Sequence, residues 1–598
     1  MSLDLDELGF DPDALREKYR TERDKRLRPE GIGQYIHIDD EFPTMLDDPH
    51  VTEPLARDAI DEHLDAVVIG AGFCGLLSGA RLRQAGVENL RMIEAAADVG
   101  GTWYWNQYPG VQCDIESYIY LPLLEELDYM PRLKYAYGPE IRNHAQNIAH
   151  RFDLYDGALF QTWVTHLAWD TDADRWIVST NRGDRLAARF VVVGNGPLSK
   201  PKLPGLRGIE DFGGKMFHTS RWDYEYTGGD TAGGLSKLAD KKVGIVGTGA
   251  TAIQCIPHLG EAAEHLYVFQ RTPSSVDVRN NRPTDEEWVA SLEPGWQEER
   301  IANFSILTSG GMATENLVSD GWTDIIRKFS GMANKNRDGA IGDMALLAEL
   351  ADFEKMEEIR ARVDEFVNDP AIADSLKPWY RQFCKRPCFH DDYLPTFTRD
   401  NVTLVDTDGK GVERLTRDAV VVGGEEHEVD CLIFATGFEV GTDYSRRASM
   451  EIRGIGGVTL TEHWEDGITT LHGLMTNDFP NLFLMGGMQS GVTPNFTELY
   501  NEQSRHVAYI VREGLEQPEQ VIEAQPDAVA AWVQTVADTA NPHSTFARNC
   551  TPGYYNNEGQ PGQGPGWFGG NFMGGAQAFF AILRDWRERG DLAGMERR

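Results

Sequence analysis

A glycine-rich turn between an apolar strand and a helix occurs twice in this chain, and it constrains the fold more than any other feature. The first copy joins a strand at Asp65–Ile69 to a helix ending near Gln84, and a second strand follows at Leu90–Ile93. Its turn has the G-x-G-x-x-G pattern, with glycines at Gly70, Gly72 and Gly75. These glycines permit a tight turn, a close approach of a pyrophosphate to the backbone, and close helix–strand packing.

The second copy joins a strand at Lys242–Val246 to a helix ending near Leu259, followed by a strand at Leu266–Gln270. Its turn has the related G-x-G-x-x-A pattern and contains Gly247, Thr248, Gly249, Thr251 and Ala252. Two such βαβ units predict an α/β protein with two Rossmann-like dinucleotide-binding domains.

The residue that ends the second strand distinguishes the two sites. Glu94 lies 24 positions after Gly70, where a carboxylate can accept hydrogen bonds from ribose hydroxyls and would repel a 2′-phosphate. Arg271 lies 24 positions after Gly247, where a guanidinium can pair with a 2′-phosphate. We therefore expect FAD or NAD at the first site and NADP at the second. A chain that binds both cofactors is expected to reduce its flavin with the nicotinamide.

The spacing of these units divides the chain into four parts. Residues 1–60 form a charged N-terminal extension with an expected helix at Asp13–Arg28, and residues 61–200 form the first part of the FAD-binding domain. Residues 201–435 hold a linker and the NADP-binding domain, with a helical insertion at about 280–380. Residues 436–598 return to the FAD-binding domain and supply C-terminal loops on the substrate side.

Composition limits the partners and the location of the protein. A net charge of −37 over 598 residues disfavours nucleic acid and anionic membranes. An acidic N-terminus without an apolar core and the lack of a long apolar run predict a cytoplasmic protein that does not enter the membrane. The seven cysteines show no pair spacing, so we expect buried thiols and no disulfide framework. No metal site is expected, because Cys384, Cys388 and His390 have no evident further ligands.

Three further motifs carry a resemblance to a known family. Phe212–Asp223 matches F-x-G-x-x-x-H-x-x-x-W-[P/D], Gly100–Asp114 matches G-G-x-W-x(4)-[FY]-P-G-x-x-x-D, and Asp430–Phe438 matches D-x(4)-A-T-G-F. The set resembles the type I Baeyer–Villiger monooxygenases over roughly residues 65–510. Membership would imply FAD, NADPH and O₂, and a C4a-peroxyflavin that converts a ketone to an ester or lactone.

The resemblance also implies roles for individual residues. The family carries an arginine in a Lys-Arg-Pro-like stretch, which here is Cys384–Pro387. Arg386 would stabilise the peroxyanion and the tetrahedral adduct, and Asp114 would pair with it and orient it. Lys385 would grip the 2′-phosphate together with Arg271 and Thr272. Further FAD contacts are expected from Gly101, Thr102, Trp103, Asp114 and Tyr120, and further NADP contacts from Gln112 and Gln270.

The fingerprint segment lies in a linker between the two domains of such enzymes. Its histidine invites a general-base role, but the resemblance implies a structural or hinge role instead. This expectation covers Phe212, Gly214, His218, Trp222 and Asp223.

Departures from the common pattern bear on the substrate. Gln107 and Gln112 stand where many members carry arginine. The N-terminal extension and the segment Asn549–Gly559 look like the branch that contains cyclopentadecanone and steroid monooxygenases. A loop rich in small residues, Met488–Thr497, falls where the family lines its substrate pocket. We expect a bulky cyclic or steroid-like ketone, acted on by a monomer or homodimer.

Two other enzyme classes and one non-enzymatic class compete with this interpretation. A flavin monooxygenase that oxidises nitrogen or sulfur shares the two-site plan. A disulfide reductase needs paired redox cysteines soon after the first site, whereas Cys74 and Cys113 are far apart. A nucleotide-binding module without catalysis would leave Arg386 without a purpose.

Overall fold

The computed structural model describes residues 8–51, 53–198, 200–335, 343–440, 444–516, 521–540, 545–561 and 570–598. The first glycine turn belongs to a seven-stranded sheet with the strand order β16-β3-β4-β5-β1-β2, in which β17 also pairs with β5. These strands are β1 (Asp61–Ile69), β2 (Leu90–Ile93), β3 (Val164–Asp170), β4 (Arg175–Thr180), β5 (Arg185–Val193), β16 (Glu451–Arg453) and β17 (Leu482–Leu484). Strands from both halves of the chain therefore complete one sheet.

The second glycine turn belongs to a five-stranded, fully parallel sheet with the order β11-β8-β7-β15-β6. These strands are β6 (Lys215–His218), β7 (Lys242–Val246), β8 (His265–Gln270), β11 (Val402–Asp406) and β15 (Cys431–Phe434). A small antiparallel sheet of β12 (Arg414–Leu415), β13 (Ala419–Val422) and β14 (Glu425–Glu428) lies beside it. The predicted α/β class with two Rossmann-like domains is confirmed.

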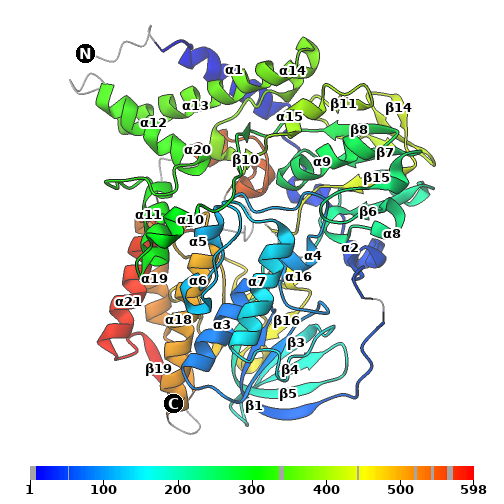
Figure 1. Cartoon of the computed structure of the whole chain (residues 1–598). Coiled ribbons are helices and arrows are strands. Elements are labelled where there is room, and N and C mark those ends of the chain that lie inside the picture. Colours follow the sequence, from blue (N-terminus) through cyan, green and yellow to red (C-terminus); the bar gives the residue numbers. More distant parts are fainter. Residues whose placement is uncertain are drawn as a thin grey trace.

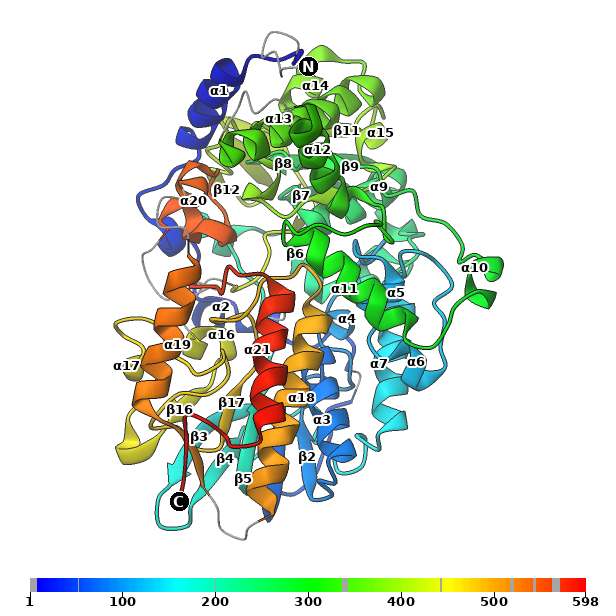
Figure 2. The same ribbon diagram turned by 90° about the vertical axis from the view of Figure 1, so that its left-hand side faces the viewer.

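Helices cover both sheets, because the apolar faces of the sheets and of the helices are buried against each other. The helix after the first turn, α3 (Phe73–Gln84), is buried over most of its length and packs against α18 (Phe496–Leu515). Beyond α18 lies α21 (Ala576–Arg589), with α19 (Pro526–Thr539) beside it (Figures 1 and 2). The helix after the second turn is α9 (Ala250–Ala262), which packs on β7 and β8. No helix in the described part of the chain is long and apolar enough to cross a membrane.

The described residues between 286 and 376 are mainly helical and contain α10 (Glu286–Ala290), α11 (Trp296–Thr308), α12 (Gly321–Lys335), α13 (Met344–Phe366) and α14 (Pro370–Leu376). The helices α12, α13 and α14 lie in the upper part of the molecule in Figure 1. The N-terminal helix α1 (Pro12–Asp24) packs on α13, where the rings of Tyr19 and Phe353 meet edge to face at 5.6 Å. The N-terminal extension thus contacts the insertion.

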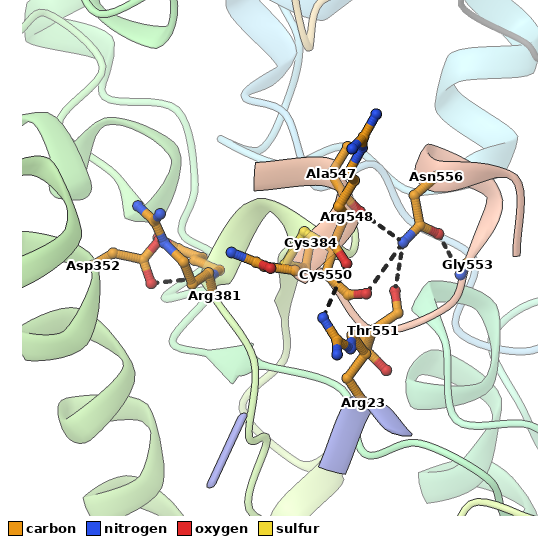
Figure 3. The surroundings of a disulfide bond; sticks show 12 residues. Arg23, Asp352, Arg381, Cys384, Ala547, Arg548, Cys550, Thr551, Gly553 and Asn556 are labelled. Carbon is orange, nitrogen blue, oxygen red and sulfur yellow. Dashed lines mark hydrogen bonds and ion pairs between the residues drawn. A yellow bond between two sulfur atoms is a disulfide. The ribbon is translucent and has the colours of Figure 1, made fainter. Parts of the chain in front are cut away.

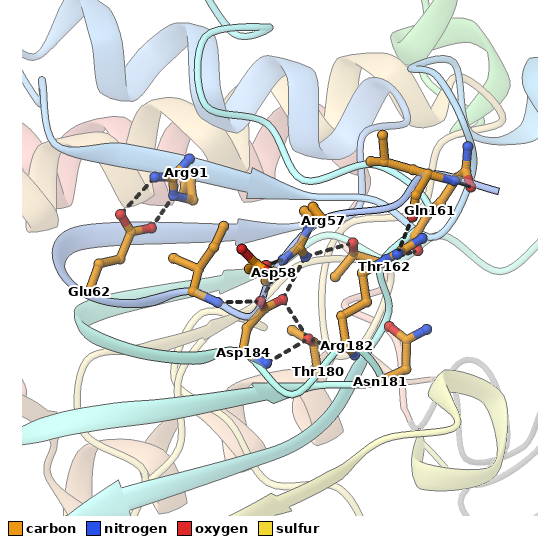
Figure 4. Close-up of polar contacts among 12 residues, drawn as sticks. Arg57, Asp58, Glu62, Arg91, Gln161, Thr162, Thr180, Asn181, Arg182 and Asp184 are labelled. Atoms are coloured by element: carbon orange, nitrogen blue, oxygen red, sulfur yellow. Dashed lines mark hydrogen bonds and ion pairs between the residues drawn. The ribbon is translucent and has the colours of Figure 1, made fainter.

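The other end of the extension is fastened to the first sheet (Figure 4). Arg57 pairs with the buried carboxylate of Asp184 through two contacts of 2.6 and 2.7 Å. The hydroxyl of Thr180 and the backbone N–H of Ile60 also donate to Asp184, at 2.6 and 2.9 Å. The hydrogen bonds from Arg57 lower the pKa of Asp184 to about 2, so this carboxylate stays charged at neutral pH.

The expectation of unpaired cysteines is wrong for two of the seven. Cys384 and Cys550 form a disulfide, with Cα atoms 5.0 Å apart (Figure 3). The two residues are 166 positions apart, so no local spacing could indicate the bond. Tyr380 and Phe546 pack around it. The remaining cysteines, Cys74, Cys113, Cys255, Cys388 and Cys431, are free and buried, as expected.

Candidate active site

The two glycine turns open into one continuous cavity of about 1550 Å³. Its lining includes Gly70 and Gly72 of the first turn, Gly247 of the second turn, and the side chains of Arg271 and Arg386. A cavity of this size exceeds the ~300–1,000 Å³ of ordinary ligand pockets. It has room for more than one bound molecule.

The first turn leaves no space for side chains, which fits a site for a pyrophosphate. Gly70 has φ +93°, and a Cβ on Gly75 would lie 1.8 Å from the carbonyl oxygen of Gly70. Gly101 has φ +52°, and its Cβ would lie 2.6 Å from the Cα of Gly72. Because only glycine is tolerated, bare backbone faces the cavity at the start of α3, where N–H groups and partial positive charge favour phosphate.

Glu94 lies at the end of β2, buried and in the cavity wall. Its carboxylate accepts hydrogen bonds from the backbone N–H groups of Ala71 at 2.6 Å and Ala96 at 2.8 Å. Burial raises the pKa of Glu94, and these two N–H groups oppose that rise. The carboxylate therefore also braces the glycine turn, a role that the sequence did not indicate.

Three aromatic or hydroxyl side chains extend the wall next to the first turn. Thr102 and Trp103 belong to the short helix α4 (Thr102–Trp105), and Tyr120 ends α5 (Ser117–Tyr120). The indole N–H of Trp103 donates to the hydroxyl of Tyr120 at 2.9 Å. The structure thus brings all three predicted FAD contacts to the cavity.

The second turn repeats the backbone geometry but has a more open middle glycine. Gly247 has φ +108°, and a Cβ there would lie 2.6 Å from the carbonyl oxygen of Ala435. A Cβ on Gly249 would meet no atom within 4 Å. The hydroxyl of Thr248 donates to the carbonyl oxygen of Thr272 at 2.8 Å, which ties the turn to the strand end after β8. The backbone here fits a second dinucleotide.

Cations gather around the end of β8. Arg271 donates to the side-chain oxygen of Gln34 at 2.9 Å and forms an ion pair of 3.4 Å with Glu558. Lys385 also lines this part of the cavity, and burial and the nearby Arg271 lower its pKa to about 8. The predicted partners of a 2′-phosphate, Arg271, Thr272 and Lys385, all line the cavity.

Arg386 and Asp114 form a bidentate ion pair in the cavity wall. Nε of Arg386 lies 3.0 Å from Oδ2 of Asp114, and Nη2 lies 2.5 Å from Oδ1. Burial lowers the pKa of Arg386, but Asp114 outweighs that effect and the pKa ends well above its usual value. The guanidinium also lies 5.2 Å from the ring of Trp322, whose indole N–H donates to the backbone oxygen of Asp114. A fixed cation results.

Two predicted NADP contacts have side chains that are engaged elsewhere. Gln270 is buried outside the cavity lining and donates to the backbone oxygen of Ser375 at 2.7 Å. Alternation along β8 explains this, because adjacent side chains point to opposite faces and Arg271 takes the cavity side. Gln112 lines the cavity, but its amide donates to the oxygen of Tyr135 and accepts from the guanidinium of Arg279.

The fingerprint residues lie outside the cavity lining, as a non-catalytic role requires. His218 ends β6 and is fully buried, which lowers its pKa to about 3, and its ring meets Phe438 edge to face. Trp222 donates to the hydroxyl of Thr227, and Asp223 caps α8 (Tyr224–Thr227). A Cβ on Gly214 would lie 2.6 Å from the ring of Phe212. Lys215–His218 of this segment forms β6 at the edge of the second sheet, and the hinge role stays a prediction.

Several cavity residues lie in no motif and were missed. Gln34, Tyr35 and Lys202 surround Arg271 and Glu558, and Trp322 supports Asp114. The loop around Gly491–Thr497 lines the cavity as expected. Gly553–Gly575 is a stretch rich in glycine and asparagine, and its residues 562–569 lie outside the described residues.

Comparison with known proteins agrees with this geometry. Residues 68–133 match the family described as an NAD(P)-binding Rossmann-like domain. A neopentalenolactone D synthase of Streptomyces avermitilis is 53% identical over 592 residues, which is 98% of this chain and 99% of the relative. A Baeyer–Villiger monooxygenase of Stachybotrys chlorohalonatus is 49% identical, covering 99% of this chain and 95% of the relative.

Solved structures with a similar fold include one named for polycyclic ketones and one named for steroids. A polycyclic ketone monooxygenase from Thermothelomyces thermophila has a TM-score of 0.88 at 35% identity, covering 98% of this chain and 99% of that one. A steroid monooxygenase bound to NADP has a TM-score of 0.71 at 30% identity, covering 90% of this chain and 99% of that one. The similarity therefore extends over both dinucleotide-binding domains.

Proposed function

The chain belongs to the type I Baeyer–Villiger monooxygenases, and we propose that its substrate is a rigid ketone of several fused rings. As a member of this family it binds FAD, uses NADPH and converts ketones to esters or lactones. Membership also sets aside nitrogen or sulfur oxygenation as the main reaction. The substrate class and the roles of individual residues are the parts proposed here.

The Arg386–Asp114 ion pair is the observation that carries the proposed mechanism. Bound FAD, once reduced by NADPH, supplies the oxygen-activating chemistry. The guanidinium of Arg386 offers N–H donors to the ketone oxygen, where negative charge develops during attack. Because two hydrogen bonds from Arg386 to Asp114 hold the fork, little reorganisation is needed when that charge forms.

The size of the cavity and the names of the relatives support a multi-ring substrate. A cavity of about 1550 Å³ extends beyond the two glycine turns to the loop at Gly491–Thr497. This loop presents small or slender side chains such as Gly491, Val492 and Thr493. Relatives are named for pentalenolactone D, polycyclic ketones and steroids. The cytoplasmic location and the monomeric or homodimeric state are also proposals.

A ketone panel tests the substrate class. Purified holoenzyme would be incubated with NADPH, O₂ and either cyclohexanone, a bicyclic ketone, a tricyclic fused ketone or a steroid ketone, with products identified by mass spectrometry. We expect kcat/KM to be highest for the fused bicyclic and tricyclic ketones. A maximum at cyclohexanone would contradict the proposal.

A further inference from the structure

Glu558 lies in a short loop whose backbone is held in an unfavourable conformation. Asn557 and Glu558 have φ values of +51° and +53°, in the left-handed region that non-glycine residues seldom adopt. Such residues persist only when the surroundings hold them there. We call residues Gly553–Gln560 the Glu558 loop; it contains the helical turn η9 (Tyr554–Gly559).

Contacts on both sides fix this loop. The amide of Asn556 donates to the backbone oxygens of Ala547, Cys550 and Thr551, while its oxygen accepts from the N–H groups of Gly553 and Gly559. The disulfide then ties Cys550 to Cys384, the neighbour of Lys385 in sequence (Figure 3). The loop is thereby attached to the segment that carries the phosphate-site lysine.

The carboxylate of Glu558 lies among the cations of the second dinucleotide site. It is 4% exposed, 3.4 Å from Nη2 of Arg271 and 3.6 Å from Nζ of Lys202. Burial raises the pKa of Glu558, but Lys202, Arg271 and Lys385 outweigh it and the pKa is lowered. The group is therefore an anion at neutral pH.

Position and charge make this carboxylate a competitor for a phosphate. Nη1 of Arg271 donates to the side-chain oxygen of Gln34, Nη2 contacts the carboxylate of Glu558 at 3.4 Å, and Tyr35 interacts with the same guanidinium. A 2′-phosphate that pairs with Arg271 needs the donors that Glu558 holds, and it brings a second negative charge close to the first. An NADH ribose, which carries no phosphate, meets no such conflict.

We propose that Glu558 sets cofactor specificity: its carboxylate holds Arg271 and Lys202 in place and competes with the 2′-phosphate of NADPH for them. Glu558 therefore lowers the preference for NADPH over NADH. The Glu558 loop must shift away from Arg271 when the phosphate binds. This inference rests on the assignment of Arg271 to the 2′-phosphate.

Calorimetric titration of the FAD-loaded protein tests this with two probes. One probe is 2′,5′-ADP, which carries the 2′-phosphate, and the other is 5′-AMP, which lacks it. Removing one like charge within ~4–6 Å corresponds to at least about one pKa unit, or ten-fold in affinity. We expect Glu558→Gln to bind 2′,5′-ADP about ten-fold more tightly and 5′-AMP as the parent does.

Glu30→Gln is the matched control, because Glu30 is exposed at the edge of the same basic region and acts electrostatically on Arg28. It should bind both probes like the parent. Glu558→Asp keeps the charge but shortens its reach, so it should tighten 2′,5′-ADP binding by a smaller factor and serves if Glu558→Gln does not fold.

Arg271→Ala separates the two ways in which the inference can fail. If Arg271→Ala weakens 2′,5′-ADP selectively while Glu558→Gln leaves it unchanged or weaker, the role of Glu558 is overturned and the phosphate site stands. If Arg271→Ala weakens both probes equally, the phosphate site itself is misassigned and the inference fails with it.

Discussion

The two dinucleotide sites have the same backbone and opposite charge. In both, a glycine with positive φ directly follows a parallel strand, and a helix begins three residues after that glycine. At the first site Glu94 ends the next strand and binds the backbone N–H groups of Ala71 and Ala96. At the second site Arg271 follows the next strand, and its guanidinium contacts the side chains of Gln34 and Glu558.

The difference shows which part of each site is rigid. Glu94 is hydrogen-bonded to the glycine turn at Ala71. Its removal would therefore weaken both the turn and the binding of the cofactor. Arg271 depends on distant segments, because Gln34 belongs to the N-terminal extension and Glu558 to the C-terminal loop. The charge at the second site can therefore be changed through residues far away in the sequence.

The largest expected effect comes from Arg386 in the wall of the shared cavity. It tests whether cofactor binding and oxygenation depend on different residues. Arg386→Ala removes the cation next to the proposed ketone position, so oxygenation should fall by about 10³-fold or more. FAD content and NADPH oxidation should persist, with hydrogen peroxide formed instead of lactone. Product analysis and peroxide assays measure this.

Arg386→Lys is the control, because it keeps a charge beside Asp114 but loses the bidentate fork. It should retain part of the activity. Lactone formation at the parental rate by Arg386→Ala would remove the assigned role.

The next effect concerns the arginine that distinguishes the second site. Arg271→Ala should raise the KM for NADPH by about 10- to 150-fold, because charged hydrogen bonds contribute ~1.5–3 kcal/mol. The KM for NADH should change less than three-fold. Steady-state kinetics with both cofactors measures the ratio, and an equal change for both would contradict the comparison of the two sites.

Glu94→Gln tests the acid-ended site in the same way. The amide keeps one acceptor oxygen but loses the charge that faces Ala71 and Ala96, so FAD should dissociate about ten-fold more readily. Flavin retention after gel filtration measures the loss of cofactor binding. The thermal midpoint of the apoprotein measures the weakening of the glycine turn. Asp65→Asn, at a partly exposed acid in the middle of β1, is the control and should leave FAD retention unchanged.

The smallest effect is a pH dependence confined to the second site. Burial lowers the pKa of Lys385 to about 8, and a bound phosphate would favour its charged form. Affinity for NADP⁺ should therefore be full below pH 7 and fall about four-fold between pH 7 and 8.5. Lys385→Arg should abolish this slope, and FAD retention should show none. If the affinity of Lys385→Arg for NADP⁺ still falls over this pH range, another group causes the pH dependence.

Local features of the fold were predictable from the sequence. Strands β2 and β7 have the bounds that the apolar runs predicted, and the glycine spacing located both turns. The N-terminal helix was expected at Asp13–Arg28 but ends at Asp24. Beyond its end, Arg26 turns inward and donates to the backbone oxygen of Arg271, a contact across 245 positions.

The site was predictable only where motifs contained it. Arg386, Asp114, Glu94 and Arg271 lie in or beside motifs, and all four line the cavity. Glu558, Lys202 and Gln34 lie in none, and Gln270 shows that a position in a motif does not decide where a side chain points.

What the sequence by itself determined is the pair of turn units, the opposite charges at their strand ends, and the family. These features depend on backbone and charge constraints that act within about 25 residues. Tertiary structure alone decided the shared cavity, the disulfide, and the place of Glu558 beside Arg271. Such contacts join positions more than 150 residues apart, and packing of whole domains, which no short pattern encodes, brings them together.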